Sequence, residues 1–340
     1  MRPKATLGFA FLAGILLLGP AQAADPQFLR IGTGGIGGTY FPVGGMIANA
    51  ISSPPGSPGC DLGGSCGVPG VIAAAVSTQG SVENAQLVSG RKLGLGLCQA
   101  DIALETFAGK GRFAGKALAN LRAIANLYTE QLHVVTRTTD SGVPAFRGIA
   151  ELKGRPVSIG EPESGTRVTA LAVLAAYGID SKKLQIVSEP IDTASDQLVA
   201  GKIDALFMVG GYPMRAIADA AERIPIALLP IEGDVAIAFR KENPFYVNSI
   251  IPANTYRDVP RTPTIGVGAL LIVAAETDED LVFDITRALW DPRNRRIFDA
   301  SKTGTTRFSL DGALVGLSIP IHPGAARYYG EIGLRPVGEY

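Results

Sequence analysis

Short apolar runs alternate along the chain with longer stretches in which apolar residues recur every three or four positions. The short runs are typical of buried strands, and the periodic stretches are typical of amphipathic helices. Strands are predicted at residues 28–31, 71–76, 93–97, 157–159 and 203–209. Strands that alternate with helices in this way predict a doubly wound α/β fold with mostly parallel sheets.

A cluster of small and polar residues follows each predicted strand and precedes each predicted helix. The clusters lie at residues 32–40, 77–81, 98–101, 161–166 and 210–213. In doubly wound sheets, ligands bind beyond the carboxyl ends of the strands, where free N–H groups at helix N-termini favour carboxylates or phosphates. Any one Ser or Thr would equally well cap its own helix. Five clusters at corresponding positions favour one shared ligand cleft over five independent caps.

The chain is expected to cross twice between two lobes. The apolar residues 121–136, interrupted by the polar residues 129–131, predict a hinge strand, and the apolar residues 224–231 predict a return strand. Two lobes joined by a few extended strands are the architecture of a binding protein that closes about a hinge. The predicted parts are a first lobe at residues 24–131, a second lobe at 132–226, and a return to the first lobe with hinge-packing C-terminal helices at 227–340.

Composition narrows the possible partners. The 340 residues contain 31 Lys and Arg against 31 Asp and Glu, and 46% of them are hydrophobic. The length suggests about two domains, and the hydrophobic fraction excludes intrinsic disorder. Because there is no basic excess to neutralise a phosphate backbone, nucleic acid is not expected as a partner.

The first 23 residues have the features of a cleavable signal peptide. Arg2 and Lys4 precede an apolar stretch at residues 7–18, and residues 21–23 read Ala-Gln-Ala, which predicts cleavage after Ala23. The alternative is an N-terminal membrane anchor, but a spanning helix needs about 20 apolar residues. The sequence therefore predicts an exported, periplasmic protein.

Export changes the interpretation of the cysteines. Cys60 and Cys66 flank a short Gly-rich loop, and in an oxidising compartment they are expected to form a disulfide. A zinc site is the alternative, but only His133 and His322 are available as histidine ligands, so no metal is expected. Cys98 lies in an apolar run and is expected to be a buried free thiol.

Five segments, taken together and in order, resemble the TAXI family of solute receptors of tripartite ATP-independent periplasmic (TRAP) transporters. The resemblance covers essentially the whole mature chain and differs from the family pattern at Glu163, where the family more often has Gly, and in the loop that contains Cys60 and Cys66. The segments are IGTGGIGGTYFP at residues 31–42, STQGSVEN at 77–84, QAD at 99–101, EPESGTR at 161–167 and MVGGYP at 208–213.

The resemblance implies a type II periplasmic binding-protein fold with a ligand cleft between its lobes. It further implies a receptor that captures a small carboxylated or amino-acid solute, such as glutamate, glutamine, 2-oxoglutarate or a dicarboxylate. The solute would pass to a TRAP membrane permease, with no cofactor and no chemical turnover. A periplasmic sensor component that presents the same ligand to a receptor domain is the alternative, because its ligand site would look the same.

An exported enzyme is a weaker alternative. Residues 32–37 match the dinucleotide fingerprint G-x-G-x-x-G, but the acidic residue expected about 20 positions later is missing from the Pro- and Gly-rich residues 51–59. Ser164 lacks the G-x-S-x-G context of a hydrolase nucleophile.

The candidate ligand-binding residues lie in the five segments of the resemblance. Ser164, Gly165 and Thr166 form the strongest carboxylate site, at one helix N-terminus. Gln99 and Asp101 would contact an amine or amide, with helix capping as the alternative for Asp101. Arg167 would add a bidentate contact or remain solvated. The full set is Thr33, Gly34, Gly38, Tyr40, Ser77, Thr78, Ser81, Asn84, Gln99, Asp101, Ser164, Gly165, Thr166, Arg167, Gly210, Gly211 and Tyr212.

Overall fold

The computed structural model describes residues 26–139, 141–299 and 308–335. The predicted signal peptide at residues 1–23 lies outside the described residues. Within the described ranges, no helix has both the length and the apolar character needed to cross a membrane.

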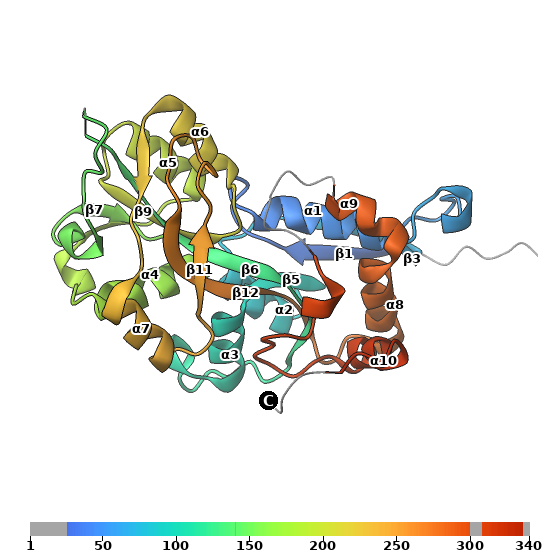
Figure 1. The fold of residues 1–340 in the computed structure, drawn as a ribbon. Helices are drawn as coiled ribbons and strands as arrows, with labels where there is room; N and C mark the ends of the chain where they lie inside the picture. Colours follow the sequence, from blue (N-terminus) through green and yellow to red (C-terminus); the bar gives the residue numbers. More distant parts are fainter. Residues whose placement is uncertain (1–25, 140, 300–307, 336–340) are drawn as a thin grey trace, which may run out of the picture.

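One mixed sheet runs through the described part of the chain, with parallel strands at each of its two ends (Figure 1). Its main strand order is β4-β1-β5-β12-β6-β9-β7-β8. One end contains β1 (Gln27–Gly32), β4 (Val71–Val76) and β5 (Leu95–Gln99), and the other contains β7 (Pro156–Ser158), β8 (Gln185–Val187) and β9 (Ala205–Gly210). The alternation of apolar runs and helices therefore predicted the α/β class correctly.

Two long antiparallel strands, β6 (Leu121–Arg137) and β12 (Thr262–Ala274), connect the two ends of the sheet. The first part of β6 pairs with β12, whereas residues 131–136 pair with β9. In the same way, residues 269–272 of β12 pair with β5, and residues 262–266 pair with β11 (Val247–Ile251). The apolar residues 121–136, predicted as one strand, do form a single strand that crosses the molecule.

The predicted return strand at residues 224–231 does not lead the chain back to the β5 end of the sheet. It forms β10 (Ile226–Leu228), which pairs with residues 135–137 of β6 and so belongs to the β9 end of the sheet. The chain instead runs back toward β5 along β12. A short apolar run fits any buried strand position, so its pattern does not identify its neighbour.

Helices cover both faces of the two ends of the sheet (Figure 1). Among the described residues, the α-helices around β7, β8 and β9 are α4 (Gly165–Ala176), α5 (Ile191–Val199), α6 (Arg215–Arg223) and α7 (Gly233–Glu242). Those around the other end are α1 (Tyr40–Ile51), α2 (Ser81–Ser89), α3 (Ala100–Ala108), α8 (Glu279–Trp290), α9 (Arg295–Asp299) and α10 (Pro323–Glu331).

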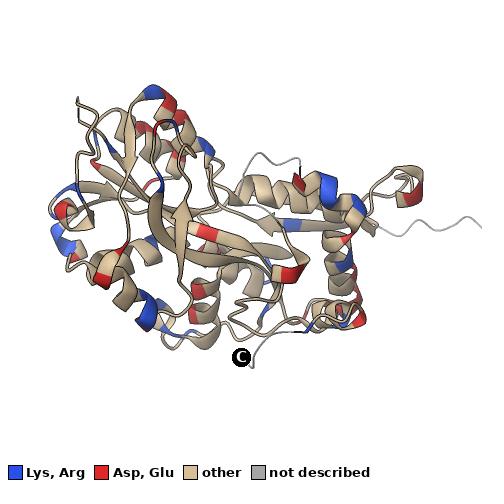
Figure 2. Ribbon diagram, in the orientation of Figure 1, with Lys and Arg blue, Asp and Glu red and all other residues tan. Residues whose placement is uncertain are grey.

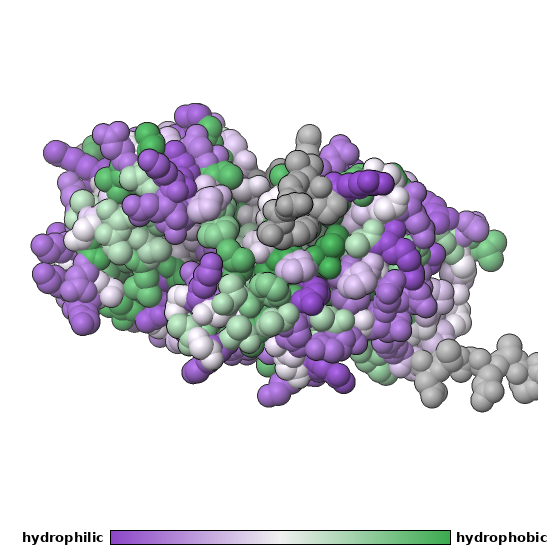
Figure 3. Space-filling model, turned by 90° about the horizontal axis from the view of Figure 1, so that it is seen from below, coloured by the Kyte–Doolittle hydropathy of each residue, from purple (hydrophilic) through white to green (hydrophobic). Residues whose placement is uncertain are grey.

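Charged and hydrophobic residues occupy different parts of the fold. Charged residues lie mainly on the outer helices and loops, and few lie on the central strands (Figure 2). Seen from below, the hydrophobic surface is divided into patches bordered by hydrophilic residues (Figure 3). Apolar side chains fill the sheet-to-helix layers, as at Ile47 of α1 and Phe207 of β9, which are almost completely buried.

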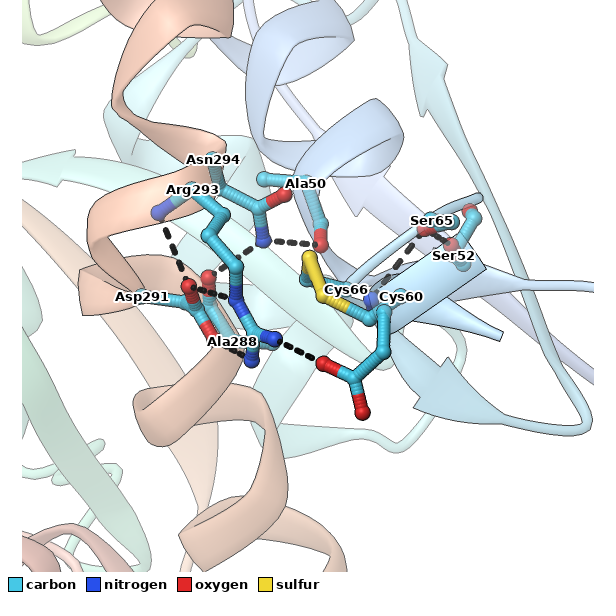
Figure 4. Close-up of a disulfide and its surroundings, with 11 residues drawn as sticks. Ala50, Ser52, Cys60, Ser65, Cys66, Ala288, Asp291, Arg293 and Asn294 are labelled. Atoms are coloured by element: carbon cyan, nitrogen blue, oxygen red, sulfur yellow. Dashed lines mark hydrogen bonds and ion pairs between the residues drawn. A yellow bond between two sulfur atoms is a disulfide. The ribbon is translucent and has the colours of Figure 1, made fainter. Parts of the chain in front are cut away.

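The predicted disulfide between Cys60 and Cys66 is present, with a Cα–Cα distance of 4.7 Å (Figure 4). Its loop follows β2 (Ser52–Ser53), contains the short helix Cys60–Leu62 and ends at β3 (Val68–Pro69). Arg293 Nη1 lies 2.8 Å from Asp61 Oδ1 and ties the loop to the segment after α8. Asp291 lies near the two sulfur atoms, but a disulfide offers no thiolate to a metal. Cys98 is free and buried, as predicted.

Candidate ligand-binding site

Five helices begin at one cavity. The cap or first residue of α1, α2, α3, α4 and α5 lines it, through Thr39, Gly80, Gln99, Ser164 and Ile191 respectively. The cavity holds about 600 Å³ of space not filled by protein, part of it open to solvent. Each helix N-terminus contributes unsatisfied N–H groups and a partial positive charge.

Eight of the predicted residues line this cavity. Their shared feature is a position at the start of α1, α2, α3 or α4, or in the turn just before it. They are Gly34, Gly38, Tyr40, Ser81, Gln99, Ser164, Gly165 and Thr166.

Four other predicted residues hold strand ends together instead of lining the cavity. The buried Asn84 donates from Nδ2 to Thr33 O at 2.7 Å and to Leu97 O at 2.8 Å, and Thr78 donates to Asn84 Oδ1 at 2.8 Å. Thr33 donates to Val76 O at 2.7 Å, and Ser77 donates to Gly34 O at 3.0 Å. These bonds join the carboxyl ends of β1, β4 and β5, so they fix the position of the turns that do line the cavity.

Arg167 also lies outside the lining. Its guanidinium donates to Ser188 Oγ at 2.7 Å on the surface, which fits the solvated alternative rather than a bidentate ligand contact. The backbone N–H of Arg167 donates to Ser164 Oγ at 3.1 Å. Arg167 lies three residues after the cap residue of α4, and its side chain is directed to Ser188 rather than to the free N–H groups at the helix N-terminus.

The cluster at residues 210–213 is likewise outside the lining. Gly211 N donates to Thr39 Oγ1 at 3.0 Å, so this segment packs behind the first turn of α1. Gly210 and Tyr212 lie beside it and do not line the cavity either. The turn after β8 lines the cavity where residues 210–213 were expected, through Glu189 and Ile191. The hydrophobic pattern contains little signal for this turn, because β8 is only three residues long and partly exposed.

The start of α4 offers backbone donors rather than hydroxyls. Ser164 Oγ caps the helix, accepting from Arg167 N and donating to Glu161 O at 2.7 Å. Thr166 Oγ1 accepts from Val209 N at 3.1 Å. The N–H groups of Gly165 and Thr166, the first two positions of α4, have no acceptor within the helix. A carboxylate in the cavity would find its donors there.

Glu130 is a cavity residue that was absent from the predicted set. It lies in the middle of β6 with 1% of its surface exposed, and Tyr40 Oη donates to its Oε2 at 2.7 Å. Burial raises the pKa of the Glu130 carboxyl to about 8, against the lowering effect of the Tyr40 hydrogen bond. The one sequence signal for Glu130 is the polar interval at residues 129–131 of an otherwise apolar strand, which was predicted as part of the hinge strand and not as part of the site.

Asp101 lies behind the cavity wall and orients Gln99. Asp101 Oδ2 accepts from Tyr246 Oη at 2.6 Å, and Oδ1 accepts from Gln99 Nε2 at 3.3 Å. Gln99 Nε2 also donates to Thr169 Oγ1 at 3.1 Å. Burial raises the pKa of the Asp101 carboxyl, while the bond from Tyr246 opposes that shift.

Acidic groups are the only charged side chains among the lining residues that the structure describes: Glu130, Glu161 and Glu189. Burial, followed by repulsion from Glu83 and Glu189, raises the pKa of Glu161. Glu163, where the sequence departs from the TAXI pattern, lies outside the lining and pairs with Arg112 at 2.8 Å.

Segments far apart in the chain meet around the cavity. Gln79 Oε1 accepts from Glu163 N at 3.1 Å. Gly37 N donates to Asp192 Oδ2 at 3.0 Å, and Ala216 N donates to Gly37 O at 3.2 Å. These bonds connect the turns after β1 and β4 with the turn after β7 and with the first turns of α5 and α6.

The remaining lining residues come from the carboxyl ends of β7 and β9 and from the turns around the predicted residues. Apart from Glu189, Ile191 and Ala194, which follow β8, these residues lie in or beside segments that the sequence pattern predicted, but the pattern did not identify which side chains would face the cavity. They are Gly35, Thr39, Gln79, Gly80, Ser158, Gly160, Glu161, Glu189, Ile191, Ala194, Phe207, Met208 and Val209.

The two ends of the sheet, the strands that cross between them and the cavity at the strand ends form the fold of two-lobed periplasmic binding proteins. The structure of PhnD1 from Prochlorococcus marinus (MIT 9301) in complex with methylphosphonate superposes with a TM-score of 0.51. The match has 11% identity and covers 84% of this chain and 93% of that one. The periplasmic aliphatic sulphonate binding protein SsuA from Escherichia coli gives a TM-score of 0.41 at 12% identity, covering 81% and 73% of the two chains.

The chain belongs to the NMT1-like family, a family of periplasmic solute-binding proteins, whose model matches residues 31–333. A PKHD-type hydroxylase of Paraburkholderia xenovorans (strain LB400) is 35% identical over 78 residues. That match spans 23% of this chain and 33% of the hydroxylase, so the chain aligns with about a third of that relative's length.

Proposed function

We propose that this protein is a receptor that captures a small carboxylated solute and delivers it to the membrane permease of a TRAP transporter. Candidate solutes are glutamate, glutamine, 2-oxoglutarate and dicarboxylates of similar size. The observation that carries the proposal is the convergence of five helix N-termini on one cavity. Gly165 and Thr166 supply the free N–H groups for a carboxylate, and the helix dipoles favour its charge.

The TRAP permease as partner is supported by the five segments that resemble the TAXI family and by membership of the NMT1-like family. Residues 1–23 would direct export, with cleavage after Ala23. The receptor would bind without chemical turnover. Both histidines have structural surroundings: His133 contacts Tyr256 Oη at 3.0 Å in the core, and His322 caps α10.

We further propose that the cavity lies between two lobes that close about β6 and β12. Residues 24–131 would begin the first lobe, and the second would begin at residue 132. The return to the first lobe would then lie within β12, which pairs with β11 at one end and with β5 at the other. This boundary lies later in the chain than the predicted residue 227.

Identification of a co-purified solute tests the proposal. The protein, isolated natively from the periplasm, is denatured, and the released small molecules are identified by mass spectrometry. The solute is then returned to refolded protein, and the melting temperature is measured. At 100 times its dissociation constant, a bound solute should stabilise the fold by about 2.7 kcal/mol. Absence of any carboxylated solute, both in the released fraction and among added compounds that raise the melting temperature, would contradict the proposal.

A further inference from the structure

The carboxyl of Glu130 reaches the cavity with one oxygen left for a ligand. Glu130 lies opposite Val267 of β12 in the middle of β6. Its Oε2 accepts from Tyr40 Oη, whereas no described residue donates a hydrogen bond to its Oε1. The side chain is 1% exposed and lines the cavity, so water outside the protein does not solvate it freely. A buried carboxyl oxygen of this kind needs a hydrogen-bond partner.

No described cation compensates Glu130. Its nearest titratable neighbours are Tyr40 on α1, Cys98 on β5, Asp101 on α3 and Tyr128 on β6, which are neutral or acidic groups. Among described residues, no Lys, Arg or His nitrogen lies within 4.0 Å of its carboxylate. Without such a partner the buried carboxyl of Glu130 keeps its proton at neutral pH. A protonated amine in the cavity would stabilise the charged carboxylate, and Glu130 would release its proton to solvent when the amine binds.

Gln99 presents a second free acceptor to the same cavity. Its Nε2 donates to Asp101 and Thr169, and Thr169 in turn bonds the hydroxyl of Tyr246 at 3.0 Å. Because the carboxylate of Asp101 accepts hydrogen bonds, the nitrogen end of the amide turns toward it, and Oε1 turns toward Gly165. The described residues donate no hydrogen bond to Gln99 Oε1.

We propose that the solute carries a protonated amine, which Glu130 and Gln99 accept, so that the receptor selects amino acids over 2-oxo acids and dicarboxylates. The inference rests on the proposed function, because the carboxylate of the same solute would lie at Gly165 and Thr166. Donors at the start of α4 and acceptors at Glu130 and Gln99 match the two charges of a zwitterion. Glu161 and Glu189 add negative charge to the wall and so disfavour a second carboxylate.

Matched pairs of compounds test the selectivity directly. The probes are glutamate with 2-oxoglutarate, alanine with pyruvate, and leucine with 4-methyl-2-oxopentanoate, together with glutamine and succinate. Isothermal titration of the solute-free wild-type protein should give at least about tenfold tighter binding for the amino acid of a pair. Equal or tighter binding of the 2-oxo acid, or tight binding of succinate, overturns this inference and leaves the proposed function standing. If no compound of either series binds, the proposed function itself fails.

The Glu130→Gln variant tests the residue. Glutamine has the same shape and still accepts from Tyr40 Oη, so the variant should fold, which circular dichroism checks. The amino acid should bind at least about tenfold more weakly to it, and the preference over its 2-oxo acid should disappear. Glu105→Gln is the matched control, because Glu105 is a half-buried carboxyl outside the cavity lining whose pKa burial also raises. Unchanged selectivity in a folded Glu130→Gln protein would show that Glu130 does not contact the amine.

Discussion

Glu130 links ligand recognition to stability through one buried carboxyl. Its usual pKa is 4.5, and burial raises the pKa in the folded protein to about 8. Between these values the folded protein binds more protons than the unfolded chain, so the free energy of unfolding falls as pH rises. His133 acts in the opposite direction at lower pH, because burial lowers its pKa from 6.5 to about 4. Above pH 6.5, the effect of Glu130 remains.

We therefore expect the solute-free protein to lose about 2 kcal/mol of unfolding free energy between pH 6.5 and 8. Urea denaturation across this range measures the loss. Glu130→Gln should remove most of it, whereas Glu105→Gln should keep it. Burial also raises the pKa of the Asp101 carboxyl, but this group is present in both variants and so does not account for a difference between them. An equally steep fall of the unfolding free energy in Glu130→Gln would mean that a group other than Glu130 causes the pH dependence.

Ser164 is expected to contribute to stability as a helix cap. Its Oγ accepts from Arg167 N at 3.1 Å, and Ser164→Ala should therefore cost about 1 kcal/mol of unfolding free energy, measured by urea denaturation. Ser188→Ala is the control, because Ser188 Oγ accepts from the Arg167 guanidinium at the surface. Its substitution should change stability by less than about 0.5 kcal/mol. Equal effects of the two substitutions would contradict the capping role.

The residues that were predicted correctly and those that were not differ in one physical respect. A Gly or Ser at the first turn of a helix lines the cavity because the backbone itself faces it, as at Gly165 and Ser81. Thr78 precedes α2 and Asn84 lies within it, and the side chains of both donate hydrogen bonds to acceptors within the protein. Residue type and spacing locate a turn along the chain. They do not fix the direction of a side chain within it.

At the scale of elements, the strands and helices at the corners were predictable, but the neighbours of some strands were not. Residues 71–76 form β4, and residues 203–209 largely match β9. β10 and β12 are both apolar, and only long-range pairing places β10 beside the end of β6 and β12 across the molecule. Pairing partners depend on the whole sheet, and a local pattern contains no information about them.

The disulfide loop is an element whose stabilisation depends on its length. Cross-linking Cys60 and Cys66 closes a short loop, which the chain-entropy relation values at about 2 kcal/mol. The Cys60→Ser/Cys66→Ser protein should lose about that much unfolding free energy and keep its affinity for the solute, because neither residue lines the cavity. Denaturation and titration of the same sample measure both quantities. An affinity loss of tenfold or more would place the loop in the binding mechanism.

At the scale of the whole molecule, a few hydrogen bonds hold together the turns on opposite sides of the cavity. Asp192 at the start of α5 accepts from Gly37 N at 3.0 Å, and its other oxygen lies 2.6 Å from Arg215 Nη2. Gly37 has no room for a side chain here, because a Cβ would lie 2.4 Å from Asp192 Oδ1. If the two lobes open about β6 and β12, these bonds exist only in the closed form.

Removal of Asp192 should therefore shift the protein toward the open form. A ligand that needs the closed form binds more weakly in proportion to the fraction of closed molecules. Loss of one hydrogen bond to a charged group, about 1.5 kcal/mol, predicts about tenfold weaker solute binding by Asp192→Ala. The solute-free variant should also have a larger radius of gyration in small-angle X-ray scattering. Asp219→Ala is the matched control, because Asp219 pairs with the same Arg215 without reaching Gly37. If both variants bind the solute alike, the bond between Asp192 and Gly37 does not control closure.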